Sequence, residues 1–297
     1  MPMQRYAEGT ASRLKEGAKR GLRSYGVATA PLRALPDFLI IGAKRAATTT
    51  LWNSVVGHPN ILPMFPAKLK TKGTGYFSIN HQRGTAWYRS FFPLTATLAL
   101  NERRDGIRPQ TGEATPYYLF HPLAPSRTKE LLPSARLVVI LRNPVDRAYS
   151  HYRERVRHGV ERLSFEDALD AEDARLAGEE ERIVRSPGYN SFAHEHLSYA
   201  RQGRYVDMFL RWLACFEREQ LLVILNEDFD EHPGRELRRV WDFLGLPPWD
   251  PPEVARYNYH PGEPMASDTR ERLLRAFATP NDELAQLLGM DLSAWRT

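Results

Sequence analysis

A loop rich in threonine and cations is the first place in this sequence where chemistry can be expected. It runs from Gly42 to Thr50 and joins an apolar run to a helical segment. A helix start offers unpaired backbone N–H groups and the positive end of the helix dipole, which together favour an anion. An ordinary strand–helix turn with two surface cations would have the same composition, but the pattern favours an anion site. The cations, alanines and threonines that would line it are Lys44, Arg45, Ala46, Ala47, Thr48, Thr49 and Thr50.

This loop is not the phosphate loop of ATP and GTP hydrolases. That motif, G-x-x-x-x-G-K-[ST], needs a glycine where this chain has Ala47 and a lysine where it has Thr48. No clear aspartate-based Mg²⁺ motif lies near the loop either. Both departures count against a nucleotide hydrolase or kinase, and we expect no metal.

A second candidate anion site follows the apolar run that ends at Leu141. Arg142 stands at the carboxyl end of that predicted strand, where α/β sheets bind ligands. Pro144 is suited to open the next helix, and Ser150 in its first turns can converge with Arg142 on a phosphate. Arg147 is expected to lie on a solvated face of the same helix. Two anion sites at two strand ends suit a ligand with phosphates at both ends.

Buried parallel strands are needed to hold these two sites together. Short apolar runs of the kind found in strands covered on both faces occupy residues 38–42, 135–144 and 220–229. Helical patterns lie over residues 144–159, 164–178 and 199–217, and a proline-rich loop over 245–264. Strands alternating with helices predict an α/β fold, a single domain with a central, mostly parallel sheet flanked by helices.

Residues 1–35 form a basic leader, and we expect the folded domain to occupy residues 36–297. Leu14, Ala18, Leu22 and Tyr25 would share one side of a helix in the leader, opposite its cations. This pattern is compatible with weak contact to an anionic membrane surface. Because the apolar face is weak, a tail that is frayed or that packs on the domain fits the sequence better.

The composition limits the cellular location and the kinds of partner that we expect for this chain. A chain of 297 residues with 42% hydrophobic and 26% charged residues is ordinary for a globular protein. The net charge of +5 suits anionic ligands but is too small to predict a nucleic-acid partner. The single cysteine, Cys215, excludes an intramolecular disulfide and is expected to pack in the core. No apolar stretch reaches the length of a membrane span, and the N-terminus lacks the apolar core of a secretory signal, so we expect a cytoplasmic location.

Together the two anion motifs resemble the 5′-phosphosulfate and 3′-phosphate loops of the superfamily of sulfotransferases that use 3′-phosphoadenosine 5′-phosphosulfate (PAPS). The chain is most similar to bacterial relatives of the heparan-sulfate-type carbohydrate sulfotransferases. The resemblance covers about Pro36 to Pro247, most of the domain. It is carried by PDFLIIGAKRAATTTLW, GYFSINHQRGTAWYRSFFP, GEATPYYLFHP, LPSARLVVILRNPVDRAYSHY, FEREQLLVILNEDF and FLGLP.

The resemblance implies a reaction and a division of roles. PAPS would be the co-substrate, and its sulfuryl group would pass to a hydroxyl or amine of a glycan, lipid or small-molecule acceptor. The 5′-phosphosulfate would lie on Lys44–Thr50, with Arg45 at the position of the family's catalytic cation, where many relatives carry lysine. Arg142 and Ser150 would hold the 3′-phosphate, and the loop around Tyr257–Gly262 would cover the donor.

The general base is where this chain departs from the family pattern. Many relatives carry a Lys-Glu pair just before two aromatic residues, but here Gly73 stands where the glutamate is expected. Glu113 is our first candidate for the base, and a purely structural role for its carboxylate is equally open. His81 and His121 are weaker candidates.

Several features have two interpretations. Trp87, Tyr88, Tyr117 and Tyr118 can stack on a sugar, although aromatic residues at such spacing are more often core. The acidic stretch 161–181 is most simply a solvated helix face, with a lid over the acceptor as the alternative. Two other functions also remain open, a phosphate-loop kinase and a non-catalytic protein that retains the PAPS-binding fold.

Overall fold

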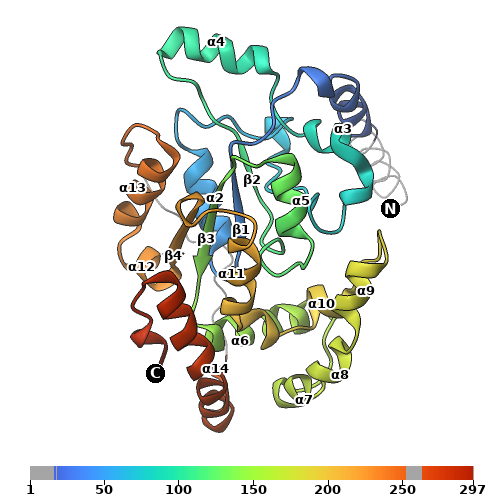
Figure 1. Ribbon diagram of the computed structural model, residues 1–297, viewed down its shortest axis with the longest axis vertical. Helices are drawn as coiled ribbons and strands as arrows, with labels where there is room; N and C mark the ends of the chain where they lie inside the picture. The colour runs from blue at the N-terminus through green and yellow to red at the C-terminus, as the bar shows by residue number, and fades with distance from the viewer. Residues whose placement is uncertain (1–16, 18, 252–262, 297) are drawn as a thin grey trace, which may run out of the picture.

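The computed structural model describes residues 17, 19–251 and 263–296, and its centre is a four-stranded sheet. All strand pairs are parallel, and the strand order is β2-β1-β3-β4. The strands are β1 (Phe38–Gly42), β2 (Gly112–Ala114), β3 (Arg136–Leu141) and β4 (Leu221–Leu225). The predicted class, a single α/β domain with a parallel sheet flanked by helices, is confirmed (Figure 1).

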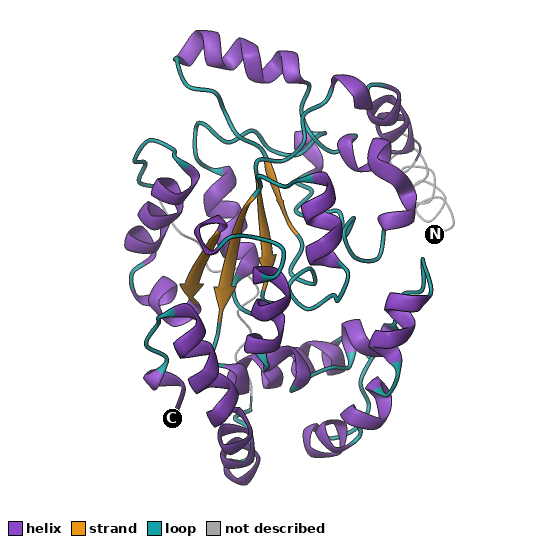
Figure 2. Ribbon diagram, viewed as in Figure 1, coloured by secondary structure: helices purple, strands orange, loops and turns teal. Residues whose placement is uncertain are grey.

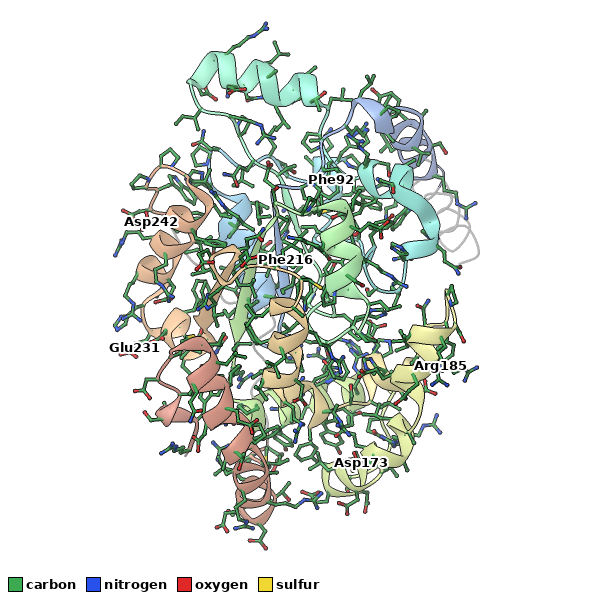
Figure 3. All side chains as sticks on the ribbon, viewed as in Figure 1. Phe92, Asp173, Arg185, Phe216, Glu231 and Asp242 are labelled. Carbon is green, nitrogen blue, oxygen red and sulfur yellow. The ribbon has the colours of Figure 1, made fainter. Side chains whose placement is uncertain are left out.

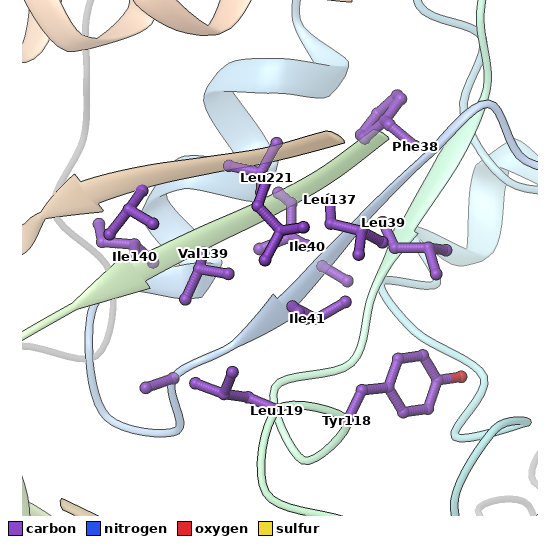
Figure 4. Packing of buried hydrophobic residues seen from close by; sticks show 14 of the residues in the cluster. Phe38, Leu39, Ile40, Ile41, Tyr118, Leu119, Leu137, Val139, Ile140 and Leu221 are labelled. Atoms are coloured by element: carbon purple, nitrogen blue, oxygen red, sulfur yellow. The ribbon is translucent and has the colours of Figure 1, made fainter. Parts of the chain in front are cut away.

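The strands are apolar because helices cover the sheet on both faces. Every residue of β1 is buried, and so is all of β3 except Arg136. Figure 4 shows side chains of β1 and β3, among them Ile40 and Leu137, packed together in the core. Phe38 pairs with Gly112 on one side and with Arg136 on the other. A Cβ atom at Gly112 would lie 2.5 Å from the ring of Phe38, so this strand position has room only for glycine.

Helices connect the strands and form most of the surface (Figure 2). Figure 1 shows α2 behind the sheet, with α5 and α11 in front of it. In chain order, the first helices are α2 (Thr48–Val56), α3 (Gly84–Arg89), α4 (Thr95–Asp105), α5 (Ala124–Leu131), α6 (Pro144–Arg157), α7 (Phe165–Asp170) and α8 (Glu172–Leu176). They continue with α9 (Glu179–Arg185), α10 (Phe192–His196), α11 (Tyr205–Leu213), α12 (Asn226–Glu231), α13 (Pro233–Leu244) and α14 (Ser267–Leu288).

Helix α6 carries part of the predicted site, and its start follows from local sequence. The Asn143 side chain accepts a hydrogen bond from the backbone N–H of Val145, and Pro144 takes the first helical position. Val145 and Ala148 bury themselves in a second apolar cluster with Phe165 of α7 and Phe277 of α14. The helix is therefore fixed relative to the sheet.

The sequence patterns overestimated the length of several elements. β4 ends at Leu225, not at Phe229, because polar residues follow it and start α12. The helix expected over 164–178 is two short helices, α7 and α8. The helix expected over 199–217 is reduced to α11, which starts at Tyr205. The sequence analysis did not predict β2, which is only three residues long.

The described part of the basic leader packs on the domain. Residues 19–28 are helical, and Arg23 donates a hydrogen bond of 2.8 Å to the backbone oxygen of Ser90. The Arg23 guanidinium also lies 3.4 Å from the ring centre of Phe91. Arg33 is buried and donates to the backbone oxygen of Phe92 at 2.6 Å. Leu14 and Ala18, expected on the apolar side of this helix, lie outside the described residues.

The acidic stretch is only partly a solvated surface. The Asp173 side chain is 91% exposed at the outer edge of the molecule (Figure 3). Glu161 is buried and bonds to Arg175 at 2.6 Å, and the buried Glu172 accepts from two backbone N–H groups at 2.7 and 2.8 Å. The prediction of a solvated face is wrong for Glu161 and Glu172, because each of them ties neighbouring segments together.

No described helix combines the length and the apolar composition that crossing a membrane requires.

Candidate active site

The predicted phosphate loop leads from β1 into α2 and leaves the helix start open. The Ala43 N–H donates to the backbone oxygen of Ile140 at 2.7 Å, which ties the loop to β3. Arg45 and Ala47 have left-handed backbone angles (φ 71° and 53°) that turn the chain into the helix. No side chain caps α2, whose first residue is Thr48, so its first N–H groups can meet a ligand.

The sequence analysis did not count Lys72 among the site residues, but the structure brings it to this helix start. Its ammonium donates to the hydroxyls of Thr48 and Thr49 at 3.0 and 2.9 Å. Burial lowers the pKa of Lys72 to about 8. A desolvated cation at the positive end of a helix is favourable only when an anion joins it, so this arrangement favours an anion ligand. The sequence offered one signal for Lys72. It directly precedes Gly73, the position at which the resemblance places the glutamate of a Lys-Glu pair.

Lys44 and Arg45 leave the loop toward α10 and α6. The Lys44 ammonium donates to the backbone oxygen of Glu195 at 2.9 Å, and burial lowers its pKa to about 8. The Arg45 guanidinium donates to the Ser150 hydroxyl at 3.1 Å and to the Glu154 carboxylate at 3.0 Å. The structure therefore joins two residues assigned from the sequence to opposite ends of the ligand.

Arg142 lies at the carboxyl end of β3, as predicted, and is half-buried. Its backbone oxygen accepts a hydrogen bond of 2.9 Å from the Tyr205 hydroxyl, which fixes the strand end. Within residues 19–251 and 263–296, no hydrogen bond or ion pair engages its guanidinium. This cation is therefore available for a ligand phosphate.

Arg147 does not lie on a solvated surface, so that prediction is wrong. It is fully buried and donates to the backbone oxygen of Tyr199. Burial lowers its pKa. The face of α6 that carries Arg147 packs against the segment leading to α11, which excludes water from the guanidinium.

The segment around Gly73 is packed against β2. The backbone oxygen of Lys72 accepts from the N–H of Ala114 at 2.8 Å. A Cβ atom at Gly73 would lie 2.3 Å from the Ala114 oxygen and 2.4 Å from the Thr115 hydroxyl. Such distances are far below van der Waals contact, so a glutamate does not fit at position 73 in this backbone.

Glu113 lies inside the protein and holds that same segment in place. Its carboxylate accepts from the Thr74 N–H at 2.6 Å, the Tyr118 hydroxyl at 2.9 Å and the Thr115 hydroxyl at 3.0 Å. Burial raises the pKa of Glu113, although these hydrogen bonds oppose the shift. The contacts are those of a structural carboxylate, and they link β2 to the Lys72 segment.

The weaker candidates for the base, His81 and His121, differ in burial. His121 is buried, and burial lowers its pKa to about 3, whereas His81 is half-buried. Tyr88, Tyr117 and Tyr118 are buried and belong to the core, whereas Trp87 is half-buried beside it. Stacking on an acceptor is thus open to Trp87 alone among these four aromatic residues.

Three further predictions concern the single cysteine, a metal site and the loop expected to cover the donor. Cys215 is half-buried against the core and is a free thiol. Among the described residues, no cluster of three or more His, Cys, Asp or Glu side chains can hold a metal ion. The loop around Tyr257–Gly262 lies outside the described residues.

Comparison with known proteins identifies the family. The model of the sulfotransferase domain family matches residues 35–260. The chain is 28% identical over 295 residues to human bifunctional heparan sulfate N-deacetylase/N-sulfotransferase 3, covering 88% of this chain and 31% of that protein. Caenorhabditis elegans bifunctional heparan sulfate N-deacetylase/N-sulfotransferase 1 is 29% identical over 227 residues, covering 76% of this chain and 24% of that protein. The chain thus spans less than a third of the length of these curated relatives.

A solved structure agrees with this result. The crystal structure of a sulfotransferase from Alicyclobacillus acidocaldarius superposes with a TM-score of 0.67 and 31% sequence identity, covering 89% of this chain and all of that one. The resemblance seen in the phosphate loop and in the Arg142–Ser150 segment therefore extends through the whole fold. This chain belongs to the sulfotransferase family of enzymes.

Proposed function

We propose that this protein transfers the sulfuryl group of PAPS to an amine or hydroxyl of an acceptor. The observation that supports this most directly is the start of α2, where Lys72 donates to Thr48 and Thr49 beside open backbone N–H groups. Arg142 and Ser150 lie on the adjoining strand β3 and helix α6. One anion site on each of two neighbouring strands fits a donor with charged groups at its 5′ and 3′ positions.

The proposed reaction is a single displacement at sulfur. An acceptor nitrogen or oxygen forms a bond to sulfur while the bond from sulfur to the 5′-phosphate oxygen breaks, and 3′-phosphoadenosine 5′-phosphate (PAP) leaves. The protein contributes mainly by aligning the reactants and by neutralising the charge that develops on the leaving phosphate. We assign the leaving-group cation to Arg45, which stays charged throughout.

The proton of the acceptor needs a group that can exchange it near neutral pH. Glu113 was the first candidate from the sequence, but its oxygens are engaged by Thr74, Thr115 and Tyr118. The geometry supports the structural alternative for Glu113. Lys72, with a pKa of about 8, is the group at the helix start whose pKa suits proton exchange.

The acceptor is proposed from the relatives. Their names describe N-sulfotransferases acting on heparan sulfate, so an amine on a glycan is the first acceptor to test. Acceptor specificity varies on a shared donor scaffold. Hydroxyls of glycans, lipids and small molecules therefore belong in the same panel.

Thermal unfolding with PAP, compared with ATP plus Mg²⁺, tests the donor. A ligand that binds only the native state raises the melting temperature. We expect a rise with PAP and none with ATP–Mg²⁺, and the reverse result would favour a kinase. Mass spectrometry of an acceptor panel incubated with PAPS then tests transfer. PAP binding without a gain of sulfate on any acceptor would favour the non-catalytic binding protein.

A further inference from the structure

A carboxylate lies inside the half of the site expected to bind the 3′-phosphate. Glu154 and Ser150 are four residues apart on α6 and therefore share a face of the helix. One oxygen of Glu154 accepts from the Arg45 guanidinium at 3.0 Å, and the other accepts from Arg155 at 2.8 Å. Arg45 also donates to the Ser150 hydroxyl at 3.1 Å. The same guanidinium thus bridges a predicted phosphate ligand and an internal anion.

The ion pair of Glu154 with Arg45 is shielded from water, so the electrostatic interaction between the two charges is stronger than in a surface ion pair. The side chains of Arg45 and Glu154 are only 15% and 17% exposed. Burial alone would raise the pKa of Glu154, but Arg45 and Arg155 hold it below its usual range. The carboxylate is therefore ionised at neutral pH and acts as a fixed negative charge.

A cavity opens directly onto this pair. It has a volume of about 330 Å³, and its polar lining consists of Arg45, Ser150, Tyr152, Arg153, Glu154 and Arg157. Three arginines frame the space, and Glu154 is the one carboxylate among the residues that line it. Such a lining attracts an anion, but an anion at Ser150 lies close to a charge of its own sign on Glu154.

We propose that Glu154 is a positioning residue whose charge opposes the 3′-phosphate of the donor at Ser150, and so limits how tightly donor and product are held. The proposal rests on PAPS being the donor. In the free protein, Glu154 neutralises Arg45 and keeps it on Ser150. When the donor binds, its 3′-phosphate meets Ser150 about one helical turn from the carboxylate, and the two negative charges repel each other. Because PAP keeps the 3′-phosphate, the same repulsion favours product release.

The variant Glu154→Gln tests this, because it removes the charge and keeps the shape. We expect PAP to bind about fivefold more tightly to the variant, the size of a partly shielded charge interaction. Adenosine 5′-phosphate, which lacks the 3′-phosphate, should change by less than about twofold on the same scale. Calorimetry measures both affinities, and the readout is the change in PAP affinity divided by the change in adenosine 5′-phosphate affinity. The gain for PAP should shrink as the salt concentration is raised from about 50 to about 300 mM, because screening becomes strong over roughly this range.

Glu236→Gln is the matched control. Glu236 is also buried and also pairs with two arginines, Arg235 and Arg239, but it lies on α13. It should leave the affinities for both nucleotides unchanged, whatever it does to stability.

Other outcomes overturn the proposal. Equal changes for PAP and adenosine 5′-phosphate would mean that Glu154 only shapes the site. Weaker binding of PAP to Glu154→Gln would mean that the carboxylate, by holding Arg45 on Ser150, helps the site to bind the 3′-phosphate instead of opposing it. If the unaltered protein binds no PAP, the donor assignment itself fails, which is a separate result from a normal PAP affinity that the variant leaves unchanged.

Discussion

The two ends of the candidate donor site treat charge in opposite ways. At the start of α2, the Lys72 ammonium meets only the hydroxyls of Thr48 and Thr49 among the described residues. On α6, the Arg45 guanidinium already has a carboxylate partner in Glu154. The buried charge of Lys72 has no anionic partner until a ligand binds, whereas the charge of Arg45 is neutralised by Glu154 before any ligand binds. An enzyme that must hold its donor and release its product can use this difference, with attraction at one end and moderated attraction at the other.

Removing Arg45 should have the largest effect on transfer. We expect Arg45→Ala to lower turnover by about 100-fold or more, because a cation that stabilises the leaving group is lost in a shielded site. Single-turnover measurements with PAPS isolate this step. Arg104→Ala, an exposed arginine on α4, is the control and should be neutral. Near-normal turnover in Arg45→Ala would place the leaving-group cation elsewhere, with Lys72 as the next candidate.

Arg142→Ala sharpens the comparison at the 3′ end. It should weaken PAP binding by about 10- to 100-fold, because charge-assisted hydrogen bonds to phosphate contribute roughly 1.5–3 kcal/mol. Adenosine 5′-phosphate should be little affected. The control is Arg136→Ala, at the exposed opposite end of the same strand. A similar loss for both nucleotides would show that Arg142 does not read the 3′-phosphate.

The open end should respond to pH. The pKa of Lys72 is lowered to about 8, so a bound anion that restores a higher pKa must lose affinity as the pH rises above 8. We expect PAP binding to weaken by about fivefold between pH 7 and 9, and Lys72→Arg to flatten this dependence. Lys44 has a similar pKa, so Lys44→Arg is measured in parallel. An unchanged slope in Lys72→Arg would assign the titration to another group.

The titration of Lys72 does not itself destabilise the fold as the pH rises. The pKa of Lys72 is lower in the folded chain than its ordinary value of 10.5. Between these values the unfolded chain binds more protons than the folded one. The Lys72 contribution to the free energy of unfolding therefore rises with pH in this window. A melting curve at each pH checks the point.

The smallest effect on the donor is expected at Glu113. Glu113→Gln should lower the free energy of unfolding by about 1–3 kcal/mol, because an amide cannot accept all the hydrogen bonds that the carboxylate accepts. Denaturant titration measures this change, and PAP affinity should be retained. Glu102→Gln on α4 serves as the control. Loss of turnover in a stable, PAP-binding Glu113→Gln protein would restore Glu113 as the general base.

The fold was readable from the sequence where the physical signal is local. The apolar runs at residues 38–42 and 136–141 are typical of strands covered on both sides, and Asn143-Pro144 marks the start of α6. β2 escaped prediction because three residues carry no periodicity. Its strand character comes from pairing with β1 and not from its own composition.

The site was predicted in its parts but not in its connections. Arg142, Ser150 and the loop before α2 lie where their strand and helix ends place them. Arg45 and Glu154 are 109 positions apart in the sequence. Lys72 is 24 positions from Thr48 and 23 from Thr49. Long-range contacts of this kind depend on the tertiary fold. The spacing of Ser150 and Glu154 on one helical face was the signal that could have brought Glu154 into view.

The close approach of Gly73 to Ala114 has a consequence for the engineering of this chain. The substitution Gly73→Glu would place a side chain where the Ala114 oxygen already lies. A glutamate therefore cannot be installed here by one substitution. The backbone of residues 72–74 would have to separate from β2 first, and Glu113 with its hydrogen bonds to Thr74 resists that separation. Installing a carboxylate at this position requires that the two segments be redesigned together.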